Sequence, residues 1–148
     1  MTEEHQNQMR EVSLCYNWLM DNCTFCKIIN RQIHGYVISE NKNVIVFLSL
    51  ENHPLVVPKR HIKDVYELDE QTGNEVMKEL VKTARAVKKG LECEGVYLTQ
   101  ANEPAAGQDV FHIHFHVYPR WQDQMMNQAN EVDDSERQST LEKIKNVY

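Results

Sequence analysis

The sequence has no long run of apolar residues. Its longest run, residues 44–50, includes Ser49 and is much shorter than the roughly 20 residues that a membrane-spanning helix needs. The amino terminus, MTEEHQNQ, also lacks the basic and apolar regions of a signal peptide. We therefore expect no membrane partner and a cytoplasmic location.

Positive charge is in the minority, and cysteine is sparse. The chain has 16 lysines and arginines against 22 aspartates and glutamates, a net charge of −6, so it lacks the basic surface that nucleic-acid binding requires. Its 4 cysteines are too few and too unevenly spaced for a secreted disulfide scaffold. The close pair Cys23 and Cys26, in a C-x-x-C motif, instead favours metal or redox chemistry.

Short strands and one long helix are predicted for the middle of the chain. With 148 residues and no internal repeat, the chain is one domain by length. Apolar residues that recur every three or four positions between Asp69, a helix cap, and Gly90, a helix stop, predict the long helix. Stretches rich in β-branched and aromatic residues predict strands. These strands are residues 36–39, 44–48, 55–57, 96–100 and 111–118.

The two ends of the chain differ from the middle. Residues 1–22 carry apolar side chains at helical spacing, which predicts an amphipathic helix. These side chains are Met9, Val12, Tyr16 and Leu19. Residues 122–148 form a polar tail in which SERQ is similar to a capping box ahead of Leu141. The tail is expected to be a short helix or a mobile segment.

Three of the 7 histidines lie within FHIHFHVYPR, residues 111–120. Because side chains on a strand alternate between its faces, one face would be apolar and the other would carry imidazoles. The first face comprises Phe111, Ile113, Phe115 and Val117, and the second comprises His112, His114, His116 and Tyr118. The histidine face is interpreted as a solvated edge, a metal site or a nucleophile that attacks phosphorus, and its density of histidines disfavours the first.

The residues around these histidines indicate a family. GQDVFHIHFHVYPR, residues 107–120, resembles the signature of the histidine triad (HIT) superfamily, and CTFCKIINRQI, ENKNVIVFL and HPLVVPKRH are similar to other parts of it. The resemblance covers residues 23–121. It implies an α+β fold with about five mostly antiparallel strands and one long helix packed on the sheet. It also implies a homodimer that pairs through the long helix and the VYLTQ strand.

The resemblance implies nucleotidyl transfer in two steps. His114 attacks the α-phosphorus of a nucleoside phosphate and forms a covalent nucleotidyl-histidine, which water then hydrolyses. His116 and Gln108 assist at the phosphate. Further positions imply a nucleotide pocket, with core packing as the alternative for the apolar ones. They are Asn102, Phe25, Ile28, Phe47, Leu50 and, behind the histidines, His53.

The resemblance to zinc-bearing relatives implies which residues complete the metal site. These relatives complete a C-x-x-C pair with two histidines, and the matching positions here are His61 and His112. The expected ligand set of a structural zinc ion is therefore Cys23, Cys26, His61 and His112. A thiol switch is the weaker alternative, because no strand of a βαβ unit directly precedes CTFC.

The sequence departs from the family in one loop. Between Phe47 and His53 it is about four residues shorter, and Ser49 stands where an aspartate commonly binds ribose, with Glu51 nearby. The ending HVYPR is similar to that of dinucleoside polyphosphate hydrolases. The expected function is therefore cleavage of a nucleoside phosphoanhydride through nucleotidyl-His114. The alternatives are a phosphoramidase of the same mechanism and a zinc-stabilised nucleotide-binding or scaffold protein without turnover.

Overall fold

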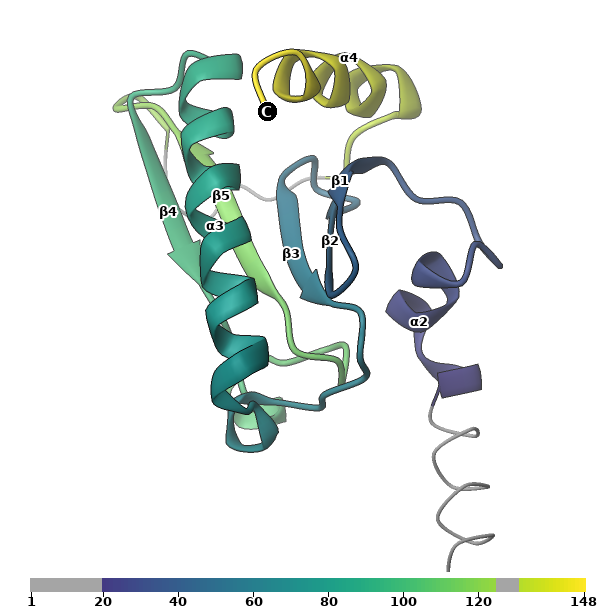
Figure 1. Ribbon diagram of the computed structural model, residues 1–148. Coiled ribbons are helices and arrows are strands. Elements are labelled where there is room, and N and C mark those ends of the chain that lie inside the picture. Colours follow the sequence, from purple (N-terminus) through teal and green to yellow (C-terminus); the bar gives the residue numbers. More distant parts are fainter. Residues whose placement is uncertain (1–19, 125–130) are drawn as a thin grey trace, which may run out of the picture.

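A five-stranded antiparallel sheet forms the centre of the protein in the computed structural model, which describes residues 20–124 and 131–148 (Figure 1). The strand order is β1-β2-β3-β5-β4. The elements are α2 (Thr24–Ile29), β1 (Val37–Glu40), β2 (Val44–Leu48), β3 (Pro54–Pro58), η1 (Val65–Glu67), α3 (Glu70–Gly90), β4 (Gly95–Thr99), η2 (Pro104–Ala106), β5 (Phe115–Arg120) and α4 (Asp134–Lys145). The expected α+β fold is confirmed, and most of the helix expected within residues 1–22 lies outside the described residues.

The central strands β2 and β3 are buried along their whole length. On one face of the sheet, Val44, Val46 and Leu48 join the core cluster beneath α3. On the other face, Ile45 and Phe47 pack with residues of α2. Burial of both faces explains why these strands are continuous apolar runs and do not alternate with polar residues. The sheet thus separates a core under α3 from a second, smaller core under α2.

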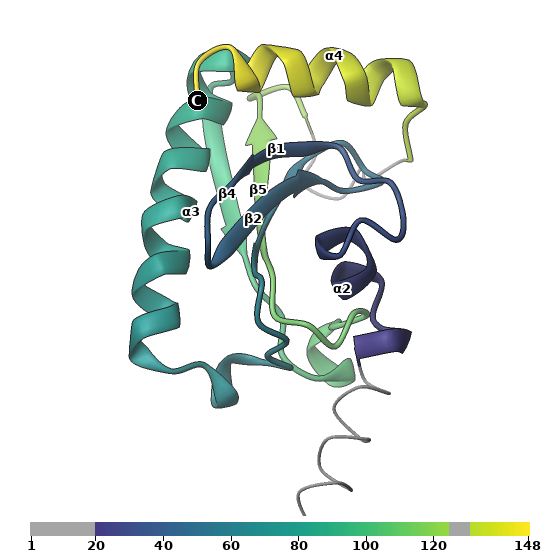
Figure 2. The same ribbon diagram turned by 45° about the vertical axis from the view of Figure 1, so that its right-hand side comes forward.

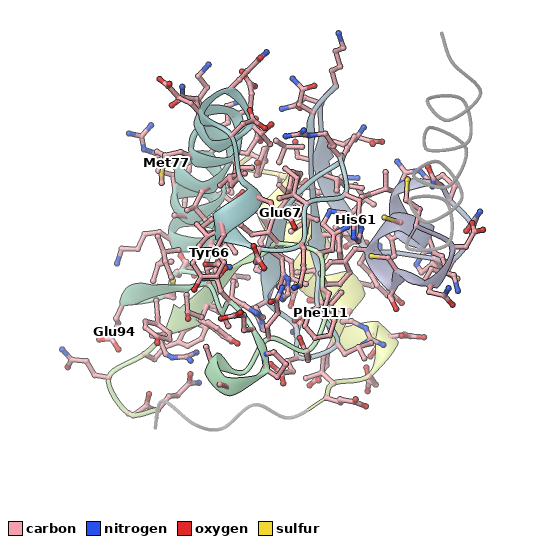
Figure 3. All side chains as sticks on the ribbon, turned by 90° about the horizontal axis from the view of Figure 1, so that it is seen from below. His61, Tyr66, Glu67, Met77, Glu94 and Phe111 are labelled. Atoms are coloured by element: carbon pink, nitrogen blue, oxygen red, sulfur yellow. The ribbon has the colours of Figure 1, made fainter. Side chains whose placement is uncertain are left out.

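The long helix α3 begins as predicted. The Asp69 side chain accepts a hydrogen bond from the Thr72 amide at 2.9 Å, which caps the first turn. Its buried face packs on the sheet and includes Val76, Leu80, Ala86 and Val87. Met77 lies on the outer face, where it is 54% exposed (Figure 3). Val81 is 40% exposed. The apolar residues of α3 therefore extend beyond the face that packs on the core.

As predicted, α3 ends at Gly90, but Gly90 does not adopt the left-handed backbone of a glycine cap. The left-handed backbone that follows the helix falls on Glu92, with φ 52°, and not on a glycine. A Cβ atom on Gly90 would lie 2.6 Å from the carbonyl oxygen of Lys143 in α4. Glycine is therefore needed here because the backbones of two helices come close together.

The polar tail contains a helix, α4, that lies across the ends of α3 and β1 (Figure 2). The Asp133 side chain caps it by accepting from the Glu136 amide at 2.9 Å, so the cap precedes the SERQ motif that was expected to supply it. At the end of the tail, the Tyr148 hydroxyl donates to Glu79 in α3 at 2.7 Å. Among the described residues, no helix is both long and apolar enough to cross a membrane.

Candidate active site and metal centre

The histidine stretch is a strand only from Phe115 onward. Upstream of Phe115, the Ile113 amide donates to the carbonyl of Ile62 at 2.7 Å. The backbone there is bonded to the segment after β3 and does not pair with a strand of the sheet. The expected continuous strand is therefore wrong for residues 111–114, and Phe111, expected in the core, is 44% exposed (Figure 3). His112 and His114 are both buried, but they take part in two different sites.

The four expected zinc ligands meet beside α2. The sulfur atoms of Cys23 and Cys26 and the Nδ1 atoms of His61 and His112 all lie within 4.8 Å of one another. The sulfur–nitrogen distances are 3.3 Å between Cys26 and His61 and 3.4 Å between Cys23 and His112. Zinc bonds of about 2.3 Å to sulfur and 2.0 Å to nitrogen give a tetrahedron with edges of roughly 3.5 Å. The donor types and the spacing of this Cys2His2 cluster therefore fit a zinc ion.

His112 presents the nitrogen that a metal requires. Its Nε2 atom donates to the Pro58 carbonyl at 2.7 Å, which leaves Nδ1 unprotonated and directed at the two sulfurs. A hydrogen bond from the Cys26 thiol is the largest of the effects that lower the pKa of Cys23, so this sulfur is held as a thiolate. Residue patterns carry no signal for the Pro58 carbonyl, because any residue supplies a backbone acceptor.

His114 is held in the tautomer that a nucleophile needs. It is 6% exposed, and its Nδ1 atom donates to the backbone carbonyl of His112 at 2.7 Å. A proton on Nδ1 leaves the Nε2 lone pair for attack. The Phe25 ring meets the His114 ring edge-on, with centroids 4.9 Å apart. Burial lowers the pKa of His114, which keeps the ring neutral near pH 7.

His116 and His53 form an imidazole pair next to His114. His53 Nε2 lies 2.8 Å from His116 Nδ1, and the Ser49 hydroxyl lies 3.0 Å from His53 Nδ1. Burial lowers the pKa of His53 to about 3 and that of His116 to about 4. The Tyr118 ring stacks on His116, with centroids 5.4 Å apart, and packs at a tilt against His53, with centroids 3.9 Å apart. The roles of Ser49 and Tyr118 as partners of these histidines were not predicted, although Tyr118 continues the alternation along the strand.

The amides of Gln108 and Asn102 hold the loop before the histidines. Gln108 Oε1 accepts from the Glu103 amide at 2.7 Å, and its Nε2 donates to the Lys63 carbonyl at 2.7 Å. Asn102 Oδ1 accepts from the Val65 amide at 2.8 Å. Both side chains therefore shape this loop, and the contacts with a phosphate that were expected of them stay predictions.

Only some of the residues expected to line the nucleotide pocket lie together. Phe25, Ile28 and Phe47 are buried together under α2, where the rings of Phe25 and Phe47 lie 5.3 Å apart. Leu50 lies outside this cluster and is 62% exposed. Glu51 lies beside His53, with 3.9 Å between Glu51 Oε2 and His53 Nδ1. The loop between β2 and β3 thus directs both Ser49 and Glu51 toward His53.

Three histidines cluster at the start of β5, where the first belongs to the Cys2His2 cluster and the second is buried with its Nδ1 bonded to a backbone carbonyl, and this arrangement defines a histidine triad protein. In agreement, the model of the HIT domain family matches residues 30–123. The chain belongs to the HIT domain family.

Several known proteins are similar to the chain. The Bacillus subtilis protein called Protein hit is 37% identical over 105 residues, which cover 68% of this chain and 72% of that protein. A yeast protein, adenosine 5'-monophosphoramidase of Saccharomyces cerevisiae, is 29% identical over 102 residues, 66% of this chain and 62% of that one. A HIT-like protein of Bartonella henselae has a TM-score of 0.82 at 30% identity, covering 86% and 97% of the two chains. A zinc-bound histidine triad family protein of Mycobacterium smegmatis has a TM-score of 0.73 at 27% identity, covering 86% and 94%.

Proposed function

We propose that this protein is a nucleotide hydrolase or nucleotidyl transferase that cleaves a nucleoside phosphoanhydride, of the dinucleoside polyphosphate type, through a covalent nucleotidyl-His114. The observation that carries the proposal is the 2.7 Å hydrogen bond from His114 Nδ1 to the His112 carbonyl. This bond orients the ring and leaves its other nitrogen as a neutral nucleophile in a buried site.

The reaction proceeds by two displacements. His114 Nε2 forms a bond to the α-phosphorus as the anhydride P–O bond breaks, and the leaving phosphate departs with the bonding electron pair. Water then attacks the same phosphorus, the P–N bond breaks, and the released nucleotide leaves His114 neutral again. His116, whose Nδ1 atom lies 2.8 Å from His53 Nε2, is proposed to contact the phosphate. The loop that Gln108 and Asn102 stabilise supplies further hydrogen-bond donors to the phosphoryl oxygens.

The substrate is expected to enter from the side of Phe25, Ile28 and Phe47, which provide apolar contacts for the base. HVYPR favours an anhydride substrate. The yeast monophosphoramidase supports the alternative of a phosphoramidate, which is cleaved by the same two steps. A protein that binds nucleotides without turnover is the remaining alternative, because Ser49 replaces a carboxylate at the sugar.

The Cys2His2 cluster is proposed to hold a structural zinc ion. Cys23 at the N-cap of α2 and Cys26 within α2 bind it, together with His61 from the segment after β3 and His112 from the histidine stretch. When bound, the ion supplies four coordination bonds that tie these segments together. Ligation by thiolates requires reduced cysteines, which agrees with a cytoplasmic location.

The test is to trap the covalent intermediate. The zinc-loaded protein is mixed with a dinucleoside tetraphosphate or with adenosine phosphoramidate, quenched in alkaline denaturant to protect the P–N bond, and weighed by mass spectrometry. We expect a mass increase of one nucleotide, absent in His114→Ala and present in His34→Ala, which changes an exposed histidine outside the site. If the wild-type protein shows neither adduct nor turnover with any nucleotide, the proposal is wrong.

A homodimer completes the proposed assembly. Met77 and Val81 on α3 and Leu98 on the edge strand β4 are 54%, 40% and 45% exposed, so they offer apolar contacts to a second copy. Sedimentation velocity should show a dimer that Val81→Glu dissociates. Leu50→Glu, the same type of change at an exposed residue of the loop between β2 and β3, should leave it intact. A wild-type monomer at all concentrations would contradict this part of the proposal.

A further inference from the structure

We infer that a cavity at the end of β5 binds the departing half of a dinucleoside polyphosphate, with Tyr97 against its base and Arg120 at its phosphate. The inference rests on the proposed function, which assigns the first half of the same substrate to His114. The cavity can nevertheless be tested by binding alone, without any turnover.

The cavity lies where the end of β5, the end of α3 and helix α4 come together (Figure 2). Its volume is about 850 Å³, within the roughly 300–1,000 Å³ of pockets that take small molecules. The wall includes His53, Tyr97, Tyr118 and Arg120. The apolar residues proposed for the first base lie elsewhere, under α2, so both halves of the substrate can be bound at the same time.

A row of side chains connects the nucleophile to this cavity. His116 lies against His114, with ring centroids 4.9 Å apart, and Tyr118 stacks on His116 at 5.4 Å. The guanidinium of Arg120 lies 4.7 Å from the centre of the Tyr118 ring. Because alternate residues of a strand share a face, His116, Tyr118 and Arg120 all lie on one face of β5. A phosphate chain that begins at His114 can therefore continue along this row into the cavity.

Tyr97 adds an aromatic surface beside the row. It pairs with Tyr118 across β4 and β5, and the two rings stack with centroids 5.9 Å apart. Tyr97 is 41% exposed, so its ring is accessible to a nucleobase, and bases of any sequence stack on such rings. Leu98, which the proposed dimer uses, points to the other face of β4. A second copy that covers Leu98 therefore does not need to cover Tyr97.

The charged side chains of the cavity match a nucleotide better than a bare phosphate chain. Two of them are cationic, Arg120 and Lys143, and two are acidic, Glu51 and Glu92. A guanidinium binds phosphate oxygens as a fork, and the rings under Arg120 orient it for this contact. The carboxylates repel phosphate but accept hydrogen bonds from sugar hydroxyls. We therefore assign the cavity to a nucleoside with its attached phosphate.

The assignment also separates the two substrate classes of the proposed function. A dinucleoside polyphosphate has a second half that this cavity can bind, whereas a phosphoramidate releases only ammonia or a small amine. Binding energy from a part of the substrate that does not react can be used to position the part that does. The cavity therefore favours the anhydride substrate.

The experiment measures the affinity of the zinc-loaded protein for three ligands by isothermal titration calorimetry. They are adenosine monophosphate, adenosine tetraphosphate and diadenosine tetraphosphate, the last two with methylene bridges that resist hydrolysis. We expect the diadenosine compound to bind about 10-fold more tightly than adenosine tetraphosphate, because only the former places a second base on Tyr97. A gain of this size is typical of one base stacked on an aromatic side chain.

Matched variants connect this preference to the named side chains. Tyr97→Leu removes the aromatic ring and should abolish the preference, whereas Tyr97→Phe keeps the ring and should retain it. Tyr66→Leu, the same change at a tyrosine that is 74% exposed outside the cavity, should bind all three ligands like the wild type (Figure 3). Arg120→Met should weaken both tetraphosphates about 10-fold and the monophosphate much less, because only the longer ligands reach the cavity.

The inference is wrong if the wild-type protein binds the two tetraphosphates equally or if Tyr97→Leu keeps the preference. It is also wrong if Arg120→Met changes the affinity of the three ligands to the same extent. A preference that depends on Tyr97, in a protein that forms no covalent adduct, would mean that only the proposed function fails. An adduct without the preference would mean that only the assignment of this cavity fails.

Discussion

Acid should destabilise this protein through the imidazole pair of His53 and His116. Burial lowers the pKa of His53 to about 3 and that of His116 to about 4, from the usual 6.5. Between these values and pH 6.5 the unfolded chain binds protons that the folded protein does not. Stability is therefore complete above about pH 6.5 and is lost as the pH falls below it.

The expected size follows from the shifts. Between about pH 7 and pH 5, a histidine with a folded pKa near 3 costs about 2 kcal/mol of unfolding free energy. His53 is 2% exposed and should contribute this full amount. His116 is less buried, and solvent screening reduces its share to about 1 kcal/mol. A total loss of about 3 kcal/mol is a large part of the 5–15 kcal/mol that is typical of folded domains.

Urea unfolding of the zinc-loaded protein at the two pH values measures this loss. His53→Gln should reduce the pH-dependent loss by about 2 kcal/mol, whatever it does to stability at pH 7. His34→Gln, at an exposed histidine, should have the pH dependence of the wild type. Metal release in acid affects all three proteins alike and cancels in the comparison. An unchanged pH dependence in His53→Gln would refute the argument that the folded protein excludes this proton.

Three further predictions concern single side chains. Gly90→Ala should lower the free energy of unfolding by about 1–3 kcal/mol because its Cβ meets the α4 backbone. Gly73→Ala, a control in the same helix at a position without a close contact, should raise it by about 0.5–1 kcal/mol. Urea unfolding measures both changes. Tyr148→Phe leaves Glu79 without its 2.7 Å donor and should cost about 1–3 kcal/mol in the same assay. Cys23→Ser should abolish stoichiometric zinc, as measured by elemental analysis, and full zinc content in this variant would contradict the ligand set.

Local patterns predicted most of the fold. Four of the expected strands lie within one residue of their predicted bounds, because each is a compact apolar or β-branched segment between turns. The start of β5 could not be predicted in this way. It depends on the bond between Ile113 and Ile62, which are far apart in the sequence, and a periodic pattern contains no information about such a partner.

The part of the candidate site that depends on residue type was predictable. The Cys2His2 set follows from a motif and a resemblance, and the structure brings all four residues together. The contacts that tune the histidines were out of reach, since Pro58 acts through its backbone and Ser49 meets His53 only after the loop folds. Gln108 shows the opposite case, because its residue type indicates a phosphate contact while its amide holds the loop.

The close crossing at Gly90 offers a diagnostic for other chains of this kind. A helix in a divergent tail is hard to detect by sequence comparison. The close approach of its backbone, however, requires a small residue at the end of α3. A glycine conserved at that point would show that a relative keeps the crossing. A bulky residue there would show that its carboxy-terminal segment takes another course.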